Sequence, residues 1–176
     1  MPERQISTVE EFLRQFPDVK EVFVDGTERP IRRPSGQDAQ RPYYSGKKKG
    51  HRVIVLSETF SGHIHDKTGA TDYGMLTPIP DDVLIHSDLG FLGVPKDRPK
   101  GTFSLPEKKP KGRLLPDEAN ARNREKARRL VLVEHALGGV KRFRAVDTLR
   151  NSVKIFADRF MLIACGRWNL RVDMTV

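Results

Sequence analysis

The chain is poor in cysteine and in long apolar runs. Cys165 is the only cysteine among 176 residues, which excludes an internal disulfide bond and a zinc site made of thiolates alone. No stretch approaches the about eighteen apolar residues of a membrane-spanning helix, and the first residues carry acids without an apolar core. These absences predict a cytoplasmic protein with no membrane partner.

Positive charge, in contrast, is in excess. The 32 Lys and Arg outnumber the 23 Asp and Glu, which gives a formal charge of +9. Such a charge favours polyanions through phosphate neutralisation, so nucleic acid is the first partner to test, with acidic proteins and membrane surfaces as alternatives. A hydrophobic fraction of 37% over this length suits one domain with one core.

In the first half of the chain, local patterns predict one helix followed by strands. A helix capped by Ser7, with Glu10 completing a capping box, ends by Pro17 within an N-terminal segment at 1–18. Apolar, β-branched runs predict strands over 19–25, 51–59 and 83–88, and the second should pair with the first. The Pro-, Gly- and Arg-rich segment 26–50 predicts a basic arm without a core element, and 66–75 stays ambiguous.

The second half predicts an extended connection and two helices. Segment 92–116 is rich in proline and lysine and predicts a solvated crossing. Pro116 and two acids open a long helix that runs to about residue 137, where Gly138 and Gly139 stop or kink it. A last helix is expected over 153–170.

Two of the predicted strands end on an aspartate, Asp25 and Asp88. Glu134 lies in the apolar phrase 130–137 of the long helix, where an unpaired carboxylate is costly. Because three carboxylates from two strand ends and a helix could converge on hard cations, they are candidate ligands of a two-metal site. Each acid also has an ordinary interpretation as a cap or turn residue.

Several phrases occur together and in order along the chain. They are VDGTERPI at 24–31, YYSGKKK at 43–49, GHIHDK at 62–67, SDLGF at 87–91, KKP at 108–110, VEHALG at 133–138 and KRF at 141–143. In this combination the chain resembles the DDE superfamily transposases of bacterial insertion sequences, which are related to Harbinger-like elements. The resemblance implies one RNase H-like mixed α/β catalytic domain over 1–176, which cleaves and joins DNA strands in transposition.

The resemblance also implies the chemistry of the site. Asp25, Asp88 and Glu134 would be the catalytic residues and would hold two Mg²⁺ or Mn²⁺ ions. Asp66, in the His-Asp-Lys phrase, is a candidate neighbour of the metals, with helix capping as the alternative. The implied partners are double-stranded DNA at element ends and target, a second copy of the chain, and a separate helix-turn-helix protein or domain. The implied location is the bacterial cytoplasm, in association with the nucleoid.

Basic and aromatic side chains in two regions are candidate DNA contacts. Those of the arm suit phosphate contact and stacking, and those of the long helix and its end form a second basic surface, in which Lys141 matches a lysine of the resembled family. A plain solvated surface is the alternative for both. The candidates are Arg29, Arg32, Arg33, Tyr43, Tyr44, Lys47, Lys48, Lys49, Arg128, Arg129, Lys141 and Arg142.

The pattern of the resembled family has one more strand between Lys49 and His51. One strand is therefore expected to be missing beside the strand that ends on Asp25. This gives a first alternative, a catalytically inactive transposase remnant that binds DNA non-specifically. A second alternative is a zinc hydrolase centred on His63 and His65, whose spacing places both on one side of an extended segment.

Overall fold

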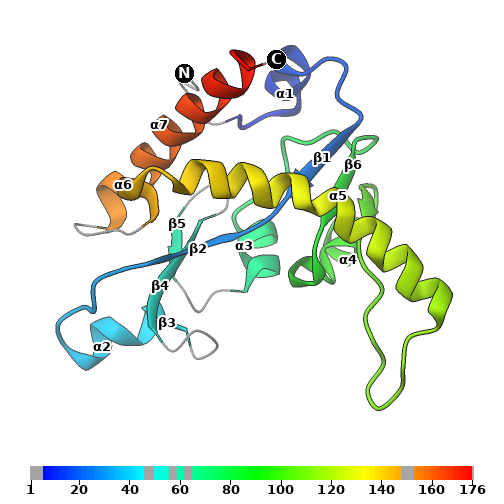
Figure 1. Ribbon diagram of the computed structural model, residues 1–176, viewed down its shortest axis with the longest axis horizontal. Coiled ribbons are helices and arrows are strands. Elements are labelled where there is room, and N and C mark those ends of the chain that lie inside the picture. Colours follow the sequence, from blue (N-terminus) through cyan, green and yellow to red (C-terminus); the bar gives the residue numbers. More distant parts are fainter. Residues whose placement is uncertain (1–5, 46–49, 56–58, 62–64, 148–152, 176) are drawn as a thin grey trace. The chain divides into compact units, whose positions relative to one another are not determined.

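The computed structural model describes residues 6–45, 50–55, 59–61, 65–147 and 153–175 (Figure 1). Contacts among Cα atoms divide the chain into two compact units. The parallel-sheet unit comprises Ile6–Asp25 and His65–Glu134, and the antiparallel-sheet unit comprises Met1–Gln5, Gly26–Ile64 and His135–Val176. That both belong to one catalytic domain stays a prediction.

A three-stranded parallel sheet organises the first unit. Its strands are β1 (Glu21–Val24), β6 (Leu84–Ser87) and β7 (Thr102–Ser104), in the order β1-β6-β7. The last three residues of β6 are buried, as expected for a central strand covered on both faces. This mixed α/β arrangement of a small parallel sheet flanked by helices confirms the predicted fold class and is consistent with an RNase H-like fold.

The helices of this unit are short, except for the last. They are α1 (Val9–Gln15), α3 (Asp66–Asp72), the 3₁₀ turn η2 (Leu89–Phe91), α4 (Val94–Asp97) and α5 (Asp117–Lys141), which continues into the other unit. The cap of α1 is Thr8, whose hydroxyl accepts from the Glu11 N–H at 3.2 Å. The prediction of Ser7 as the cap is therefore wrong by one residue. The Ser7 N–H donates to the Glu11 carboxylate instead.

An antiparallel sheet organises the second unit. Strands β2 (Thr27–Pro30), β4 (Gly50–Val55) and β3 (Tyr44–Ser45) lie in that order, and β5 (Thr59–Ser61) also pairs with β4. The helices are α2 (Gln37–Gln40), the 3₁₀ turn η1 (Arg41–Tyr43), α6 (Arg144–Asp147) and α7 (Val153–Asp173). Pairing of the 51–59 strand with the first strand is therefore wrong, because β4 pairs with β2 instead.

Three predicted boundaries need correction. The arm at 26–50 contains β2, whose Thr27 is buried, so it is not free of core elements. The connection at 92–116 contains β7 and the buried Val94, so part of it is packed. Gly138 and Gly139 do not stop α5, which runs to Lys141; a kink at these glycines stays a prediction.

The core of the antiparallel-sheet unit explains why α5 continues. Val140, Val146, Met161 and Ala164 form a buried cluster, and the Trp168 ring packs against it. A Cβ on Gly139 would lie 2.5 Å from Trp168 Cε2, so a glycine is needed where the indole meets the helix. None of the helices in the described residues has the length and apolar character that crossing a membrane requires.

Candidate functional site

Asp25 and Asp88 follow neighbouring parallel strands. Val24 of β1 pairs in register with Ser87 of β6, and each aspartate is the next residue. Since paired strands lie about 4.8 Å apart, the two residues share the carboxyl-terminal edge of the sheet. Asp25 is partly buried, and Asp88 is exposed.

A second aspartate approaches Asp88 from α3. Asp88 caps the turn η2 by accepting the Gly90 N–H at 2.8 Å, and Asp66 is the first residue of α3, which contacts η2. A Cβ built on Gly90 would lie 2.6 Å from Asp66 Oδ2 and 2.9 Å from Asp88 Oδ1. Both carboxylates therefore converge on the backbone of Gly90, and a side chain there would collide with them.

The N-cap of α3 is the residue before Asp66, so Asp66 does not have the capping role considered for it. His65 is the N-cap of α3, where its Nδ1 accepts from the Lys67 N–H at 3.4 Å. Asp66 itself is the first helical residue, where a negative charge suits the helix dipole. His63, the other member of the zinc hypothesis, lies outside the described residues.

The Asp66 and Asp88 pair has the donor chemistry of a hard cation site. The two carboxylates offer oxygen atoms on the same side of the Gly90 backbone. Mg²⁺ is commonly held by one or two protein carboxylates, while water and phosphate oxygens complete its octahedral shell. The pair fits such an ion, and Asp25 stands on the adjoining strand end.

Glu134 comes from α5 and not from a strand end or from α3. Its side chain is exposed on α5, and the neighbouring Val131 and Leu132 are 39% and 63% exposed. The apolar phrase around it is therefore largely at the surface, and the Glu134 carboxylate is not in costly apolar surroundings, as the sequence had suggested. In the part of the chain that the structure describes, no three His, Cys, Asp or Glu side chains come close enough to hold a metal ion.

A buried histidine links the two strands that end on aspartates. His86 of β6 stacks on the Phe23 ring at 4.7 Å, and its Nε2 lies 2.8 Å from Glu21 Oε2. The same carboxylate oxygen accepts from Arg129 Nη1 at 3.2 Å, which ties α5 to the start of β1. Arg129, a predicted DNA contact, thus has a structural partner. Sequence reasoning missed this network, although Glu21 and Phe23 are two residues apart and therefore share one face of a strand.

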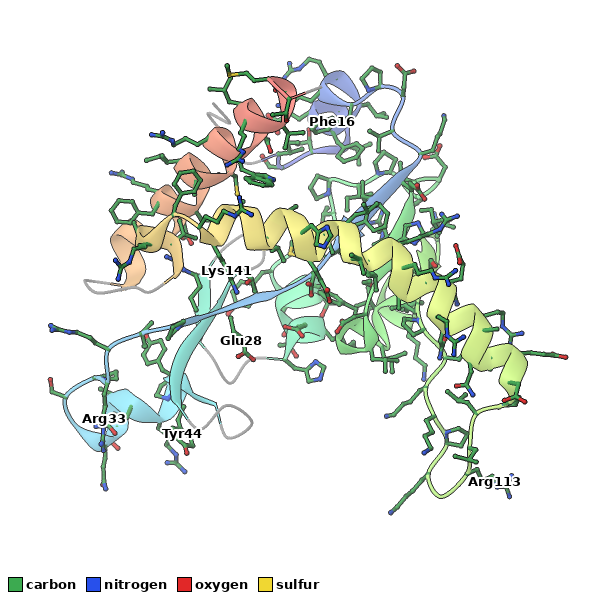
Figure 2. All side chains as sticks on the ribbon, in the orientation of Figure 1. Phe16, Glu28, Arg33, Tyr44, Arg113 and Lys141 are labelled. Atoms are coloured by element: carbon green, nitrogen blue, oxygen red, sulfur yellow. The ribbon has the colours of Figure 1, made fainter. Side chains whose placement is uncertain are left out.

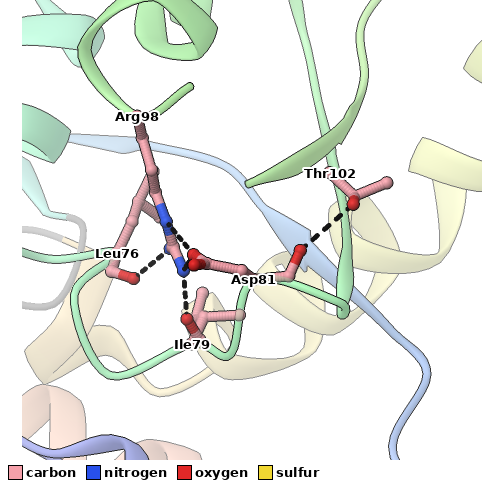
Figure 3. A network of polar contacts seen from close by, with 5 residues as sticks. All are labelled: Leu76, Ile79, Asp81, Arg98 and Thr102. Atoms are coloured by element: carbon pink, nitrogen blue, oxygen red, sulfur yellow. Dashed lines mark hydrogen bonds and ion pairs between the residues drawn. The ribbon is translucent and has the colours of Figure 1, made fainter. Parts of the chain in front are cut away.

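Two further contacts hold the segments around Asp66 and Asp88. Lys67 Nζ pairs with Asp97 Oδ2 at 2.9 Å, which joins α3 to α4. Arg98 donates to the carbonyls of Leu76 and Ile79 and to Asp81 Oδ1, as Figure 3 shows. This guanidinium organises the turn that leads into β6.

The predicted DNA contacts of the arm differ in exposure. Arg29 is fully buried, where it donates to the carbonyls of Val146 and Ala145, so its assignment as a DNA contact is wrong. Arg32 and Arg33 are exposed, and Arg33 Nε donates to a glutamine at 2.9 Å. Tyr44, labelled in Figure 2, is exposed, and Tyr43 is half-buried. Lys47, Lys48 and Lys49 lie outside the described residues.

The predicted contacts on α5 and just beyond it also have intramolecular partners. Lys141 Nζ donates to the Glu28 carbonyl at 3.3 Å. Arg142 is exposed, with its guanidinium 5.9 Å from the Trp168 ring centre. Arg128 is exposed and lies 3.5 Å from a glutamate one turn earlier. All three cations are held at or near the surface by weak contacts.

Comparison with known proteins gives two matches. A family model described as "DDE superfamily endonuclease" matches residues 24–169. The chain is 31% identical over 170 residues to a protein of Microchaete diplosiphon named "Probable transposase for insertion sequence element IS702". This match covers 87% of the chain and 58% of the relative, so the chain spans less than two thirds of that protein's length. No solved structure matches.

Proposed function

The chain belongs to the DDE superfamily endonucleases, and from this premise we propose that it is a transposase catalytic domain, which cleaves DNA at insertion-element ends and joins them to a target. The observation that carries the proposal is the register of β1 and β6, which ends two adjoining strands on Asp25 and Asp88. The approach of Asp66 to Asp88 at Gly90 supports it.

In this proposal Asp25, Asp88 and Glu134 are the catalytic carboxylates, with Asp66 as a further ligand. Asp66 and Asp88 would hold one Mg²⁺ or Mn²⁺ ion, and Asp25 and Glu134 would contribute to the binding of a second. Bound divalent ions activate a water or a DNA 3′ hydroxyl and stabilise the leaving oxygen of a phosphodiester. The Gly90 N–H orients Asp88, and α3 orients Asp66.

The proposed substrate is double-stranded DNA. Arg32, Arg33 and Tyr44 offer exposed basic and aromatic groups in the antiparallel-sheet unit, and Lys141 and Arg142 offer two more cations. Such side chains contact phosphates and stack on bases or sugars. The proposed partners also include a second copy of the chain and a helix-turn-helix protein or domain. The proposed location is in association with the nucleoid.

Nicking of supercoiled DNA in the presence of Mg²⁺ tests this function. The Asp88→Asn variant should lose nicking down to the level of buffer alone, because it removes one carboxylate of the proposed metal pair. Asp82→Asn is the matched control, since it removes the same charge from an exposed residue before β6 and should retain activity. Equal nicking by Asp88→Asn and the unsubstituted chain would refute the catalytic assignment.

The alternative is an inactive derivative that binds DNA without cleaving it. The exposure of Glu134 on α5 favours it, and so does the absence, among the described residues, of three His, Cys, Asp or Glu side chains close enough to hold a metal ion. So does the position of β1, which within the described residues pairs with β6 alone. Duplex binding without nicking in either Mg²⁺ or Mn²⁺ would establish this alternative over the first.

A further inference from the structure

The connection between β7 and α5 is fastened to α5 by side chains. Asn123 bonds to both the N–H and the carbonyl of Glu107, at 2.8 and 3.0 Å. Arg122 Nε donates to Glu107 Oε1 at 2.7 Å, and Lys126 Nζ donates to the Leu105 carbonyl at 2.7 Å. These four bonds hold the chain where it leaves the sheet, within the parallel-sheet unit.

The other end of the connection is held as well, and its middle is a turn. Asn120 Nδ2 donates to the Leu115 carbonyl at 3.1 Å. Between the two fastened ends, the Arg113 N–H approaches the Pro110 carbonyl at 3.4 Å, and Gly112 has a φ of +74°, as the third residue of a type II turn requires. A Cβ on Gly112 would meet nothing within 4 Å, so the glycine serves the backbone conformation alone.

The segment between these fastenings carries positive charge without compensation. Its cations are Lys108, Lys109, Lys111 and Arg113, all exposed, and residues 108–116 include no acid. In the described part of the chain, none of the four forms an ion pair. Figure 2 shows Arg113 near the far end of the loop.

The nearest acid in sequence, Glu107, is already neutralised. The hydrogen bond from Arg122 lowers the pKa of the Glu107 carboxyl, and the same contact raises the pKa of the guanidinium. The two charges stay paired across ordinary pH values. They hold the loop without competing for the cations at its end.

We propose that residues 108–113, named here the basic tip, bind the phosphate backbone of duplex DNA as a contact of the parallel-sheet unit. The inference rests on the proposed function, which makes DNA the substrate. Four cations without an aromatic side chain suit sequence-independent phosphate contact. Because the tip is fastened at both ends, less conformational entropy is lost when it binds.

DNA is favoured over an anionic membrane by what surrounds the tip. Leu114 at its end is 83% exposed, whereas the next residue, Leu115, is partly buried. Peripheral membrane binding uses a broad apolar face as well as basic residues, and a single leucine does not supply one. A duplex requires only the spaced positive charges.

Two charge-matched variants test the basic tip. In the tip variant, Lys108, Lys109, Lys111 and Arg113 are replaced by Gln. In the control variant, four exposed cations elsewhere in the same unit are replaced by Gln; these are Arg14, Lys20, Lys96 and Lys100. Both lower the formal charge by the same amount, so a difference between them reports local contact. Circular dichroism and thermal melts establish that each variant is folded.

The measurement is fluorescence anisotropy of a labelled duplex of arbitrary sequence, with EDTA present, over a series of KCl concentrations. Each lost phosphate contact should reduce the slope of log K against log salt by about 0.9. The tip variant should therefore lose about 2 to 4 units of slope if two to four cations touch phosphates. The control variant should stay close to the unsubstituted chain.

A third variant, Asn123→Ala, releases the loop without changing its charge. Its affinity should fall several-fold while the salt slope stays the same, because the cations remain but are less well held. Unchanged affinity would refute the role of the fastening. Equal salt slopes for the tip and control variants would refute the basic tip as a DNA contact and would leave the proposed function untouched.

Two other outcomes separate this inference from the proposed function. Absence of duplex binding by the unsubstituted chain would overturn both together. If the tip variant lost binding to vesicles containing phosphatidylserine but kept its duplex affinity, the tip would serve a membrane, and only the inference would be wrong.

Discussion

Replacing Gly139 by alanine is expected to destabilise the protein, whereas the same change at its neighbour Gly138 is expected to stabilise it. Both glycines lie inside α5, so the gain in helix propensity is equal, about 1 kcal/mol. A Cβ on Gly138 would meet nothing within 4 Å. A Cβ on Gly139 would lie 2.5 Å from Trp168 Cε2 and closer still to two further ring carbons. The sign of the effect therefore depends on one ring.

The size of the free-energy penalty of Gly139→Ala follows from how far the Trp168 ring would have to move. Carbon atoms in contact normally lie about 3.5–4.0 Å apart, so the indole would have to withdraw by about 1 Å or more. Overpacking of this kind costs about 1–3 kcal/mol. Arg142 and Arg171 also lie 5.9 and 5.8 Å from the Trp168 ring centre, and losing such contacts costs about 0.5–1 kcal/mol each. Since the propensity gain is common to both variants, they should differ by about 2–5 kcal/mol in their free energy of unfolding.

Denaturant unfolding followed by tryptophan fluorescence measures this difference. Trp168 is the only tryptophan, so the signal reports on the unit in which both glycines lie. Adding Trp168→Leu to Gly139→Ala should remove most of the penalty, with circular dichroism as the probe. If Gly139→Ala stabilised the protein as much as Gly138→Ala, the packing of Trp168 on α5 would be refuted.

Two other substitution or labelling experiments test buried groups. Arg29→Met should destabilise the protein by about 2–4 kcal/mol, because the buried carbonyl of Val146 loses its charged donor. The control Arg33→Met, in the same arm, should change stability by less than about 0.5 kcal/mol. Weaker duplex binding without a loss of stability in Arg29→Met would instead support a direct DNA contact. Burial raises the pKa of the Cys165 thiol, so iodoacetamide should label this thiol more slowly in the folded than in the urea-unfolded protein. The labelling rate of the folded protein should keep rising at pH values where that of the unfolded protein has levelled. Equal labelling rates would contradict the burial of Cys165.

Local patterns predicted those elements whose signals lie within one segment. The strands at 21–24 and 84–87 and the long helices from 117 and 153 carry apolar periodicity, capping residues or a proline at the start. Strand β7 was missed because a strand of three residues directly after Gly101 carries too short a pattern. The extent of α5 was missed because Gly139 is usually a helix breaker, and only Trp168 from another helix explains it.

The candidate site divides in the same way. Asp25 and Asp88 could be found in the sequence, since each directly follows an apolar β-branched run. The approach of Asp66 to Asp88 could not, because it depends on the packing of α3 against η2 and on a glycine between them. Glu134 and Arg29 were placed in the wrong surroundings, the first thought to be shielded and the second exposed.

The sequence by itself determined the membership of the family, the fold class, the positive charge and the two strands that end on aspartates. These properties depend on residue identity and order, which every conformation of the chain shares. The tertiary structure alone decided which side chains are buried, which carboxylate reaches Asp88 and how the basic tip is fastened to α5. Burial and contact depend on segments distant in sequence, and they arise only when those segments pack together.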